Sequence, residues 1–186
     1  MTHVFPFIPG WVCSSLIDFY MEVAEKFPDG AHMVEVGCWL GKSASILGVE
    51  LANQGKWNTR IDLVDVWDGG EDEGLAKAAA QQDLFTNCWK NLCNAGLRKF
   101  FRPINLPSVR ASRAYDDRSL QFVFVDAHHS YESVKADILA WWPKIAPGGL
   151  LSGHDFDSGT DEGVCKAVDE LYPHRILKGR CWLVEK

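Results

Sequence analysis

Acidic and imidazole side chains cluster in the segment Asp126-Ala127-His128-His129-Ser130-Tyr131-Glu132. Asp126 ends an apolar run, and two imidazoles follow it within three residues. His154 and Asp155 follow a later apolar run, and we expect them to meet this cluster one strand over. Oxygen donors with one imidazole suit Mg²⁺, Mn²⁺ or Ca²⁺ better than zinc. The cluster therefore predicts a divalent metal site where a hydroxyl group loses its proton to a neutral histidine.

A structural alternative exists for two residues of this segment, because Asp or Ser directly before a helix is often an N-cap. Asp126 and Ser130 both fit that alternative. The histidines at positions 3, 32 and 174 lie outside this edge of the expected sheet, and we expect His3, His32 and His174 to be surface or structural residues.

A glycine turn is the second feature that could do chemistry. Between Val34 and Ser43 an apolar run ends in Glu35 and Gly37, and Gly41 opens a helical segment. Such a strand, turn and helix form the crevice where open α/β sheets bind small ligands, and the glycines are expected to let the backbone approach the ligand. Three residues separate the glycines, so the spacing is neither that of a dinucleotide fold nor that of a P-loop. Gly41-Lys42-Ser43 is therefore not predicted to act in nucleotide hydrolysis.

Asp65 stands about 28 residues after Gly37, at the end of the next apolar run. An acid at that place accepts the hydroxyl groups of a ribose in dinucleotide folds, whereas a lone acid there is also typical of a turn or a cap. The ends of parallel strands share one edge of a sheet. We therefore expect the glycine turn, Asp65 and the residues from Asp126 and His154 onward to converge on one crevice.

Hydrophobic periodicity predicts an alternation of strands and helices. Pro147-Gly148-Gly149 is expected to end a helix before a short fifth strand, and an antiparallel hairpin is expected to end the chain. The expected fold is α/β, a Rossmann-like three-layer sandwich with a mostly parallel seven-stranded sheet and a C-terminal antiparallel hairpin. The expected strands are Ala31–Val36, Arg60–Val66, Lys99–Pro103, Gln121–Asp126, Leu150–Gly153, His174–Leu177 and Cys181–Glu185, and the expected helices are Trp11–Phe27, Ser43–Ala52, Leu75–Ala95 with one break, Ser108–Tyr115, Ser130–Trp142 and Asp161–Tyr172.

Length and composition limit the classes of protein. At 186 residues the simplest organisation is one domain, with residues 1–30 as an N-terminal segment and helix and residues 31–186 as the core. A net charge of −6 gives no electrostatic help to nucleic-acid binding. No apolar run approaches the roughly 18 residues of a membrane span, and the first residues lack a basic signal-peptide head. We therefore expect a cytoplasmic protein with neither a nucleic-acid nor a membrane partner.

Two further features have alternative interpretations. The six cysteines are scattered without a Cys-x-x-Cys pair, which favours reduced packing residues over a zinc site. The acidic, glycine-rich stretch from Asp68 to Gly74 is either a solvated loop or a mobile lid over a pocket.

The ordered set of motifs resembles that of class I S-adenosylmethionine-dependent methyltransferases. Val34 to Gly41, Asp65 and Asp126 match that family's signature positions. More narrowly, Val125-Asp126-x-x-His129-Ser130-Tyr131-Glu132 followed by Pro147-Gly148-Gly149 and Gly153-His154-Asp155-Phe156 resembles the macrocin O-methyltransferase-like group, which includes enzymes that methylate sugar hydroxyls. The match runs from about Ala31 to Phe156.

The resemblance implies a role for each matching residue. His129 would be the base that deprotonates the acceptor, with Asp126 beside it at the reaction centre. Asp65 would hold the ribose of S-adenosylmethionine. Asp126, Asp155 and His154 would hold Mg²⁺ or another divalent cation. The residues that the resemblance assigns to the cofactor are Glu35, Gly37, Cys38, Trp39, Gly41, Ser43, Asp65, Val66 and Asp126.

Two departures leave the metal open. The group often has an acid where this chain has His154, and often another at the position of His128. Either change could weaken Mg²⁺ binding, shift the metal preference or remove the need for a metal. Aromatic residues are expected to wall the acceptor pocket, and the candidates are Phe5, Phe7, Trp11, Trp67 and Phe156.

The expected activity is metal-assisted O-methylation of a small hydroxylated acceptor, for which a sugar is one candidate. The alternatives are a metal-independent N- or C-methyltransferase and a non-catalytic cofactor-binding module. A nicotinamide oxidoreductase is a further alternative, but the glycine spacing opposes it. Little of the chain is left for a substrate domain, so a homodimer is one way to complete the pocket.

Overall fold

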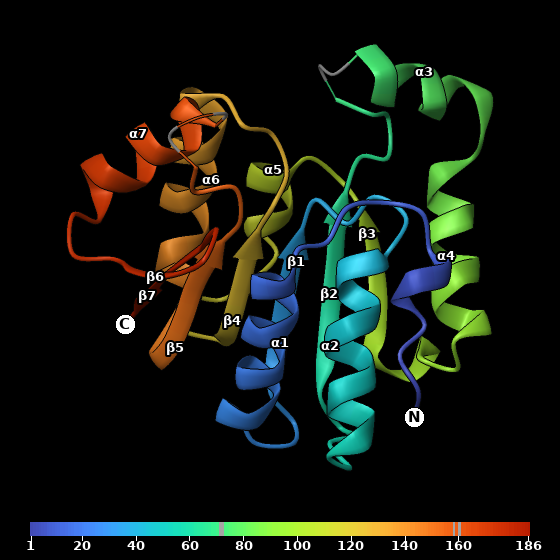
Figure 1. The fold of residues 1–186 in the computed structure, drawn as a ribbon. Helices are drawn as coiled ribbons and strands as arrows, with labels where there is room; N and C mark the ends of the chain where they lie inside the picture. Colours follow the sequence, from blue (N-terminus) through green and yellow to red (C-terminus); the bar gives the residue numbers. More distant parts are fainter. Residues whose placement is uncertain (71–72, 158, 160) are drawn as a thin grey trace.

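The computed structural model describes residues 1–70, 73–157, 159 and 161–186, which form one seven-stranded sheet flanked by helices (Figure 1). The strand order across the sheet is β3-β2-β1-β4-β5-β7-β6. The first five strands pair in parallel, and β7 is antiparallel to both β5 and β6. The predicted α/β fold is therefore confirmed. The strands are β1 (His32–Val36), β2 (Arg60–Asp65), β3 (Phe101–Asn105), β4 (Leu120–Val125), β5 (Ile145–Gly153), β6 (Ile176–Lys178) and β7 (Cys181–Glu185).

Helices cover both faces of the sheet, and two apolar cores result. One core joins Phe122 and Phe124 of β4 to the helices α1, α2 and α4, and the other joins Val123 and Val125 to α5, α6 and α7. Side chains of a strand alternate between faces, so a strand covered on both faces needs an unbroken apolar run. The helices are α1 (Ser14–Lys26), α2 (Lys42–Asn53), α3 (Glu73–Gln81), α4 (Leu84–Asn94), α5 (Ser108–Ser112), α6 (Tyr131–Trp141) and α7 (Glu162–Leu171).

The predicted bounds of every strand but the last were wrong by one residue or more, and the third and fifth strands show why. The third strand starts two residues later than predicted, because Arg98–Phe100 forms a 3-10 turn before it. The fifth strand begins at Ile145 rather than Leu150, so the glycine pair lies inside it. Gly148 has φ +76° and donates its N–H to the carbonyl of Lys186, next to a register shift against β4. The pair is therefore a bulge that keeps the strand paired.

The predicted break in the long helical region is confirmed. It separates α3 from α4 at Asp83, whose side chain accepts a hydrogen bond from the N–H of Thr86 at 2.9 Å and so caps α4. Within the part of the chain that the structure describes, no helix is both long and apolar enough to cross a membrane.

The strand order reverses direction at the centre of the sheet. The chain moves from β1 to β2 and β3 on one side, and then crosses back to β4 and β5 on the other (Figure 1). In open α/β sheets, ligands bind at such a switch point, beyond the carboxyl ends of the central strands. The end of β1 and the end of β4 are therefore where a site is expected.

Candidate active site

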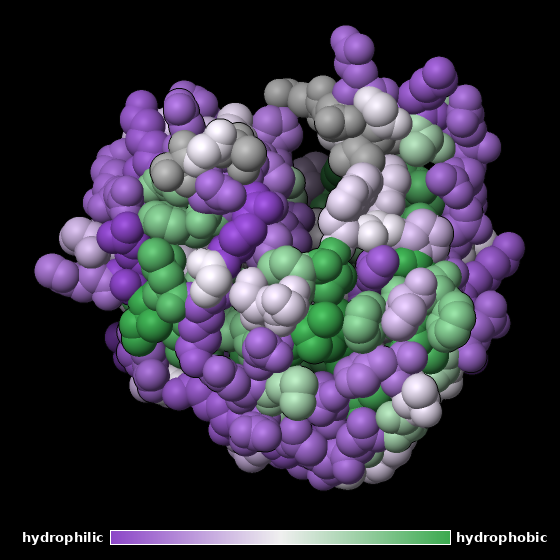
Figure 2. Space-filling view, viewed as in Figure 1, coloured by the Kyte–Doolittle hydropathy of each residue, from purple (hydrophilic) through white to green (hydrophobic). Residues whose placement is uncertain are grey.

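A cavity of about 1100 Å³ lies at that switch point. Figure 2 shows the molecule hollowed between the part that carries α6 and α7 and the part that carries α3. Small-molecule pockets usually measure about 300–1,000 Å³, so this cavity has room for two small ligands. Its lining residues from the strand ends, the adjoining loops and the start of α2 include Gly37, Cys38, Trp39, Ser43, Asp65, Val66, Asp126, His128, His129, His154 and Asp155.

Gly37 and Gly41 both make room for neighbouring protein atoms, and the approach of a ligand to the backbone of this turn stays a prediction. Both have positive φ, +85° and +81°. A Cβ on Gly37 would lie 2.0 Å from the carbonyl oxygen of Asp126, and one on Gly41 would lie 3.2 Å from Sγ of Cys88. The first glycine therefore lets the turn after β1 cross closely over the end of β4, which brings two walls of the cavity together.

Asp65 organises the glycine turn. Its Oδ2 accepts the N–H groups of Cys38 at 2.7 Å and Trp39 at 2.9 Å, and its Oδ1 accepts that of Trp67 at 2.7 Å. Burial raises the pKa of Asp65, and these N–H bonds oppose that rise. Trp39 has φ +47°, an unusual conformation for a bulky residue, and its carbonyl accepts a hydrogen bond from Nε1 of Trp67 at 2.8 Å. Asp65, the residue predicted to bind the ribose, thus holds the turn in one conformation.

Glu35 and Gly41 do not line the cavity. Glu35 is 2% exposed, and its carboxylate accepts hydrogen bonds from Tyr20 Oη at 2.9 Å and Ser43 Oγ at 2.6 Å. It therefore joins α1, β1 and α2 behind the cavity wall. Burial raises the pKa of Glu35 to about 7, and the two hydroxyl bonds oppose the rise.

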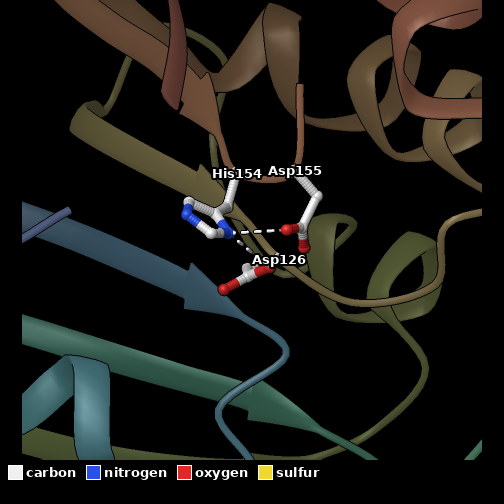
Figure 3. A group of neighbouring side chains, drawn as sticks. All are labelled: Asp126, His154 and Asp155. Carbon is white, nitrogen blue, oxygen red and sulfur yellow. Dashed lines mark ion pairs between the residues drawn. The ribbon is translucent and has the colours of Figure 1, made fainter. Parts of the chain in front are cut away.

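Asp126, His154 and Asp155 offer three possible metal ligands at the ends of β4 and β5 (Figure 3). One donor atom from each lies within 4.8 Å of the other two. Nδ1 of His154 is 2.9 Å from Oδ1 of Asp155 and 4.0 Å from Oδ1 of Asp126. Asp155 has φ +58°, a conformation that Asp tolerates, and it directs the carboxylate toward the imidazole. The three predicted metal ligands therefore lie together.

The charges of this cluster depend on one another. Burial raises the pKa of Asp126, and the negative charge of Asp155 adds to that rise. Burial lowers the pKa of His154, but its hydrogen bond to Asp155 and the negative charges of Asp126 and Asp155 together outweigh that effect and raise the pKa to about 9. Burial would also raise the pKa of Asp155, but the hydrogen bonds from His129 and His154 hold it well below its ordinary range. The positive charge of the imidazoles thus balances the carboxylates in this structure, as a bound cation would.

His129 is held between two carboxylates. Its Nε2 lies 3.0 Å from Oδ2 of Asp155, and its Nδ1 lies 2.8 Å from Oδ1 of Asp161. The bond to Asp155 raises the pKa of His129 to about 9. A Cβ on Gly163 would lie 2.3 Å from the carbonyl oxygen of His129, so this glycine lets the start of α7 bring Asp161 to the imidazole.

The sequence predictions missed three residues that complete the site. NH2 of Arg180, in the turn between β6 and β7, lies 2.9 Å from Oδ1 of Asp155 and 2.7 Å from Oδ2 of Asp161. Sγ of Cys13, before α1, lies 3.2 Å from Nε2 of His154. The sequence placed Asp161 at a helix start, Arg180 in a hairpin and Cys13 in the core, and no local pattern marked their approach to the cavity.

The structure distinguishes between the alternative interpretations of the N-cap candidates, the outlying histidines and the cysteines. Ser130 is the N-cap of α6, since its side chain accepts a bond from the N–H of Ser133, and Asp126 lies outside that cap. His3 pairs with Glu50 and His32 with Asp62, both away from the residues that line the cavity. All six cysteines are free.

Among the five aromatic wall candidates, only Trp11 lines the described part of the cavity. It is 76% exposed. Trp67 is buried against Phe85, and Phe156 lies under the guanidinium of Arg175. In the acidic stretch, residues 68–70 line the cavity, whereas Glu71 and Asp72 lie outside the described residues.

Comparisons with known proteins agree with this fold. The O-methyltransferase NovP superposes with a TM-score of 0.71 at 18% identity, covering 92% of this chain and 79% of that one. An O-methyltransferase from Bacillus cereus in complex with SAH gives 0.61 at 15% identity, covering 97% and 86%. A precorrin 8W decarboxylase from Methanobacterium thermoautotrophicum gives 0.62 at 17%, covering 90% and 76%. At these identities the likeness establishes a shared fold, which hosts more than one kind of chemistry.

Sequence comparisons establish the family. An uncharacterized protein of Sinorhizobium fredii, y4gI, is 28% identical over 124 residues, which make up 67% of this chain but only 13% of that protein. The family model described as a methyltransferase domain matches residues 34–156, from the strand before the glycine turn to the residue after Asp155. The chain therefore belongs to this methyltransferase-domain family.

Proposed function

We propose that this methyltransferase transfers a methyl group from S-adenosylmethionine to a hydroxyl group of a small acceptor, assisted by a divalent metal ion. One observation carries the proposal. A single cavity has the turn ordered by Asp65 on one wall and the cluster of Asp126, His154, Asp155 and His129 on another. The structural neighbours that are O-methyltransferases, one of them in complex with SAH, support it.

The residues of the glycine turn fit the cofactor. S-adenosylmethionine supplies a methyl group that its sulfonium already makes electrophilic. The turn from Gly37 to Trp39 is fixed by hydrogen bonds to Asp65, so it needs little reordering when a ligand binds. The Asp65 carboxylate also lines the cavity, where it can accept hydroxyl groups of a ribose. The chain's main task is to align the acceptor oxygen with the methyl group.

The carboxylates and imidazole at the ends of β4 and β5 fit a divalent ion, since Asp126 and Asp155 supply hard oxygens and His154 a nitrogen. Such an ion favours the ionised form of an acceptor hydroxyl. Two further residues that line the cavity, His129 and Arg180, bind Asp155 and hold it in place.

His129 is the residue placed to take the acceptor's proton. Asp161 holds Nδ1 and directs Nε2 toward the metal cluster. The base must be neutral, and the bond to Asp155 raises its pKa to about 9. A cation that engages Asp155 would weaken that hold on the proton and so favour the neutral imidazole. Metal and base are therefore linked through one carboxylate.

A transfer assay tests the proposal. Labelled S-adenosylmethionine would be supplied with a panel of small sugars, phenols and amines, with and without a chelator. We expect labelled product from hydroxylated acceptors, lost on chelation and restored by a divalent ion. Transfer to amines that survives chelation would replace the proposal with metal-independent N-methylation. Cofactor binding without transfer, unchanged when Asp126 and His129 become alanine, would favour a non-catalytic module.

The identity of the acceptor, membership of the macrocin O-methyltransferase-like group and a homodimeric state are proposals as well. The chain spans 13% of the relative y4gI, so the activity proposed is that of the methyltransferase unit. A sugar hydroxyl of the kind modified by the macrocin O-methyltransferase-like group is our first candidate acceptor. The exposed Trp11 at the cavity offers an aromatic face on which such a ring could stack.

A further inference from the structure

The side chain at position 154 bears on which ion the cluster prefers. A metal cluster of carboxylates alone suits Mg²⁺, which prefers oxygen ligands and keeps several waters. Here one of the three donor groups is an imidazole, and Nδ1 of His154 is the atom that faces Asp126 and Asp155. Imidazole nitrogen suits first-row transition ions.

His154 is fixed in that orientation from its other side. Its Nε2 lies 3.2 Å from Sγ of Cys13, and Cys13 in turn lies 3.0 Å from Oγ of Ser15. The His154 side chain is only 10% exposed, so the ring has little freedom to turn. In metal sites the second nitrogen of a ligating histidine usually donates to a carboxylate, a backbone carbonyl or water, which sets the tautomer and leaves the first nitrogen free for the metal. Here Sγ of Cys13 lies in the place of that partner.

We propose that His154, held by Cys13, makes this site selective for a first-row transition ion that binds imidazole nitrogen, such as Mn²⁺ or Co²⁺, over Mg²⁺. The inference rests on the proposed function for the use of the ion in methyl transfer, but the selectivity itself is a property of the free protein. Nε2–H of His154 then donates to Sγ of Cys13, while Nδ1 joins one oxygen each of Asp126 and Asp155 as a ligand.

The test compares two variants that each add a carboxylate to the same cavity. His154→Asp replaces the nitrogen ligand, whereas His128→Asp adds the same charge outside the three-residue cluster. Affinities for Co²⁺ and for Mg²⁺ would be measured by calorimetry on the protein without cofactor. Almost any carboxylate site prefers Co²⁺ to some degree, so the change in the ratio of the two affinities is the informative quantity.

We expect the Co²⁺/Mg²⁺ affinity ratio to fall at least about tenfold in His154→Asp, equivalent to about 1.4 kcal/mol, and to stay within about threefold in His128→Asp. Electron spin echo spectra of the Mn²⁺-loaded wild type should show nitrogen modulation that His154→Asp loses. An unchanged ratio in His154→Asp, equal changes in both variants, or no nitrogen modulation would overturn the inference.

The role of Cys13 has its own readout. Cys13→Val keeps an apolar side chain but cannot accept from Nε2, and we expect about tenfold weaker Co²⁺ binding, in line with the loss of an outer partner. Cys13→Ser restores an acceptor and should recover most of the affinity. Should His154→Asp fail to fold, this pair still tests the inference, since equal Co²⁺ affinities in Cys13→Val and Cys13→Ser would contradict it.

Failure of this inference can be told apart from failure of the proposed function. Wild type that binds S-adenosylmethionine and transfers methyl groups, but prefers Mg²⁺ as strongly as His154→Asp does, would overturn the selectivity alone. Wild type that selects Co²⁺ through His154, but neither binds S-adenosylmethionine nor transfers methyl groups, would overturn the proposed function alone.

Discussion

Two clusters of carboxylate and basic groups lie on this sheet, and they differ in what remains available to a ligand. Asp62, in the middle of β2, is fully buried and accepts hydrogen bonds from His32, Arg60, Arg102 and Tyr115. A carboxylate has about four acceptor sites, so these four residues occupy it. Burial alone would raise the pKa of Asp62, but these bonds hold it well below its ordinary range.

The cluster at the cavity has similar residue types, but one of its carboxylates, Asp126, differs from Asp62, whereas Asp155 is held by basic groups as Asp62 is. Asp126 lies 4.0 Å from Nδ1 of His154, beyond hydrogen-bond distance, and burial raises its pKa. Its side chain borders the cavity and so can meet a ligand. A carboxylate occupied by its own chain stabilises the fold, whereas one placed at a cavity wall with its pKa raised is a candidate for function. Substitutions in the Asp62 cluster should therefore lower mainly the stability, whereas substitutions in the cavity cluster should lower mainly the activity.

The largest expected effect is on methyl transfer. His129→Gln removes the proposed base but keeps a polar side chain, and we expect kcat to fall by about 10²–10⁴ while the protein stays folded. His32→Gln makes the same change in the Asp62 cluster and should leave kcat within about threefold. Both rates would be measured with labelled S-adenosylmethionine and the best acceptor. An equal loss of kcat in the two variants would contradict our assignment of different roles to the two clusters.

The next effect is on stability. Asp62→Ala leaves the buried Tyr115 hydroxyl and the guanidinium groups without their acceptor, and we expect a loss of about 3 kcal/mol in the free energy of unfolding. Asp126→Ala removes a carboxylate that repels Asp155, so its cost should be below about 1 kcal/mol. Urea unfolding of both variants at pH 7 measures the difference. A larger loss in Asp126→Ala would reverse our assignment of the two roles.

A third buried acid, Glu35, adds a pH dependence. Its pKa is raised from 4.5 to about 7 by burial, so the folded state binds its proton more tightly than the unfolded state does. Its contribution to stability therefore falls as the pH rises from about 4.5 to about 7 and is constant above that. Glu35→Gln cannot ionise, and we expect its stability relative to wild type to increase by about 2 kcal/mol between pH 5 and pH 8. A relative stability independent of pH, in urea unfolding at both values, would contradict the raised pKa.

Short-range pattern was enough to predict the architecture. Apolar runs ending in Glu35-x-Gly37, Asp65, Asp126 and His154 placed four strand ends on one edge, and the structure has them there. The pattern could not distinguish an acid behind the wall from one inside the cavity. Glu35 points toward α1 and Asp65 toward the cavity, although both end their strands.

Residues that reach the site from distant elements escaped prediction for a physical reason. Asp161 meets His129 only because Gly163 lets α7 pack closely on the loop before α6. Cys13 and Arg180 arrive from opposite ends of the chain. Such contacts depend on tertiary packing, and no local spacing encodes them.

The central claim is that the turn ordered by Asp65 is a cofactor site, and one calorimetric titration with S-adenosylmethionine tests it most directly. Asp65→Asn keeps an oxygen for the N–H groups of Cys38 and Trp39 but loses the charge, and Asp62→Asn makes the same change three residues earlier on the strand. We predict binding by the wild type, about 10–100-fold weaker binding in Asp65→Asn, and unchanged affinity in folded Asp62→Asn. Wild type that does not bind, or equal losses in the two variants, would contradict the account.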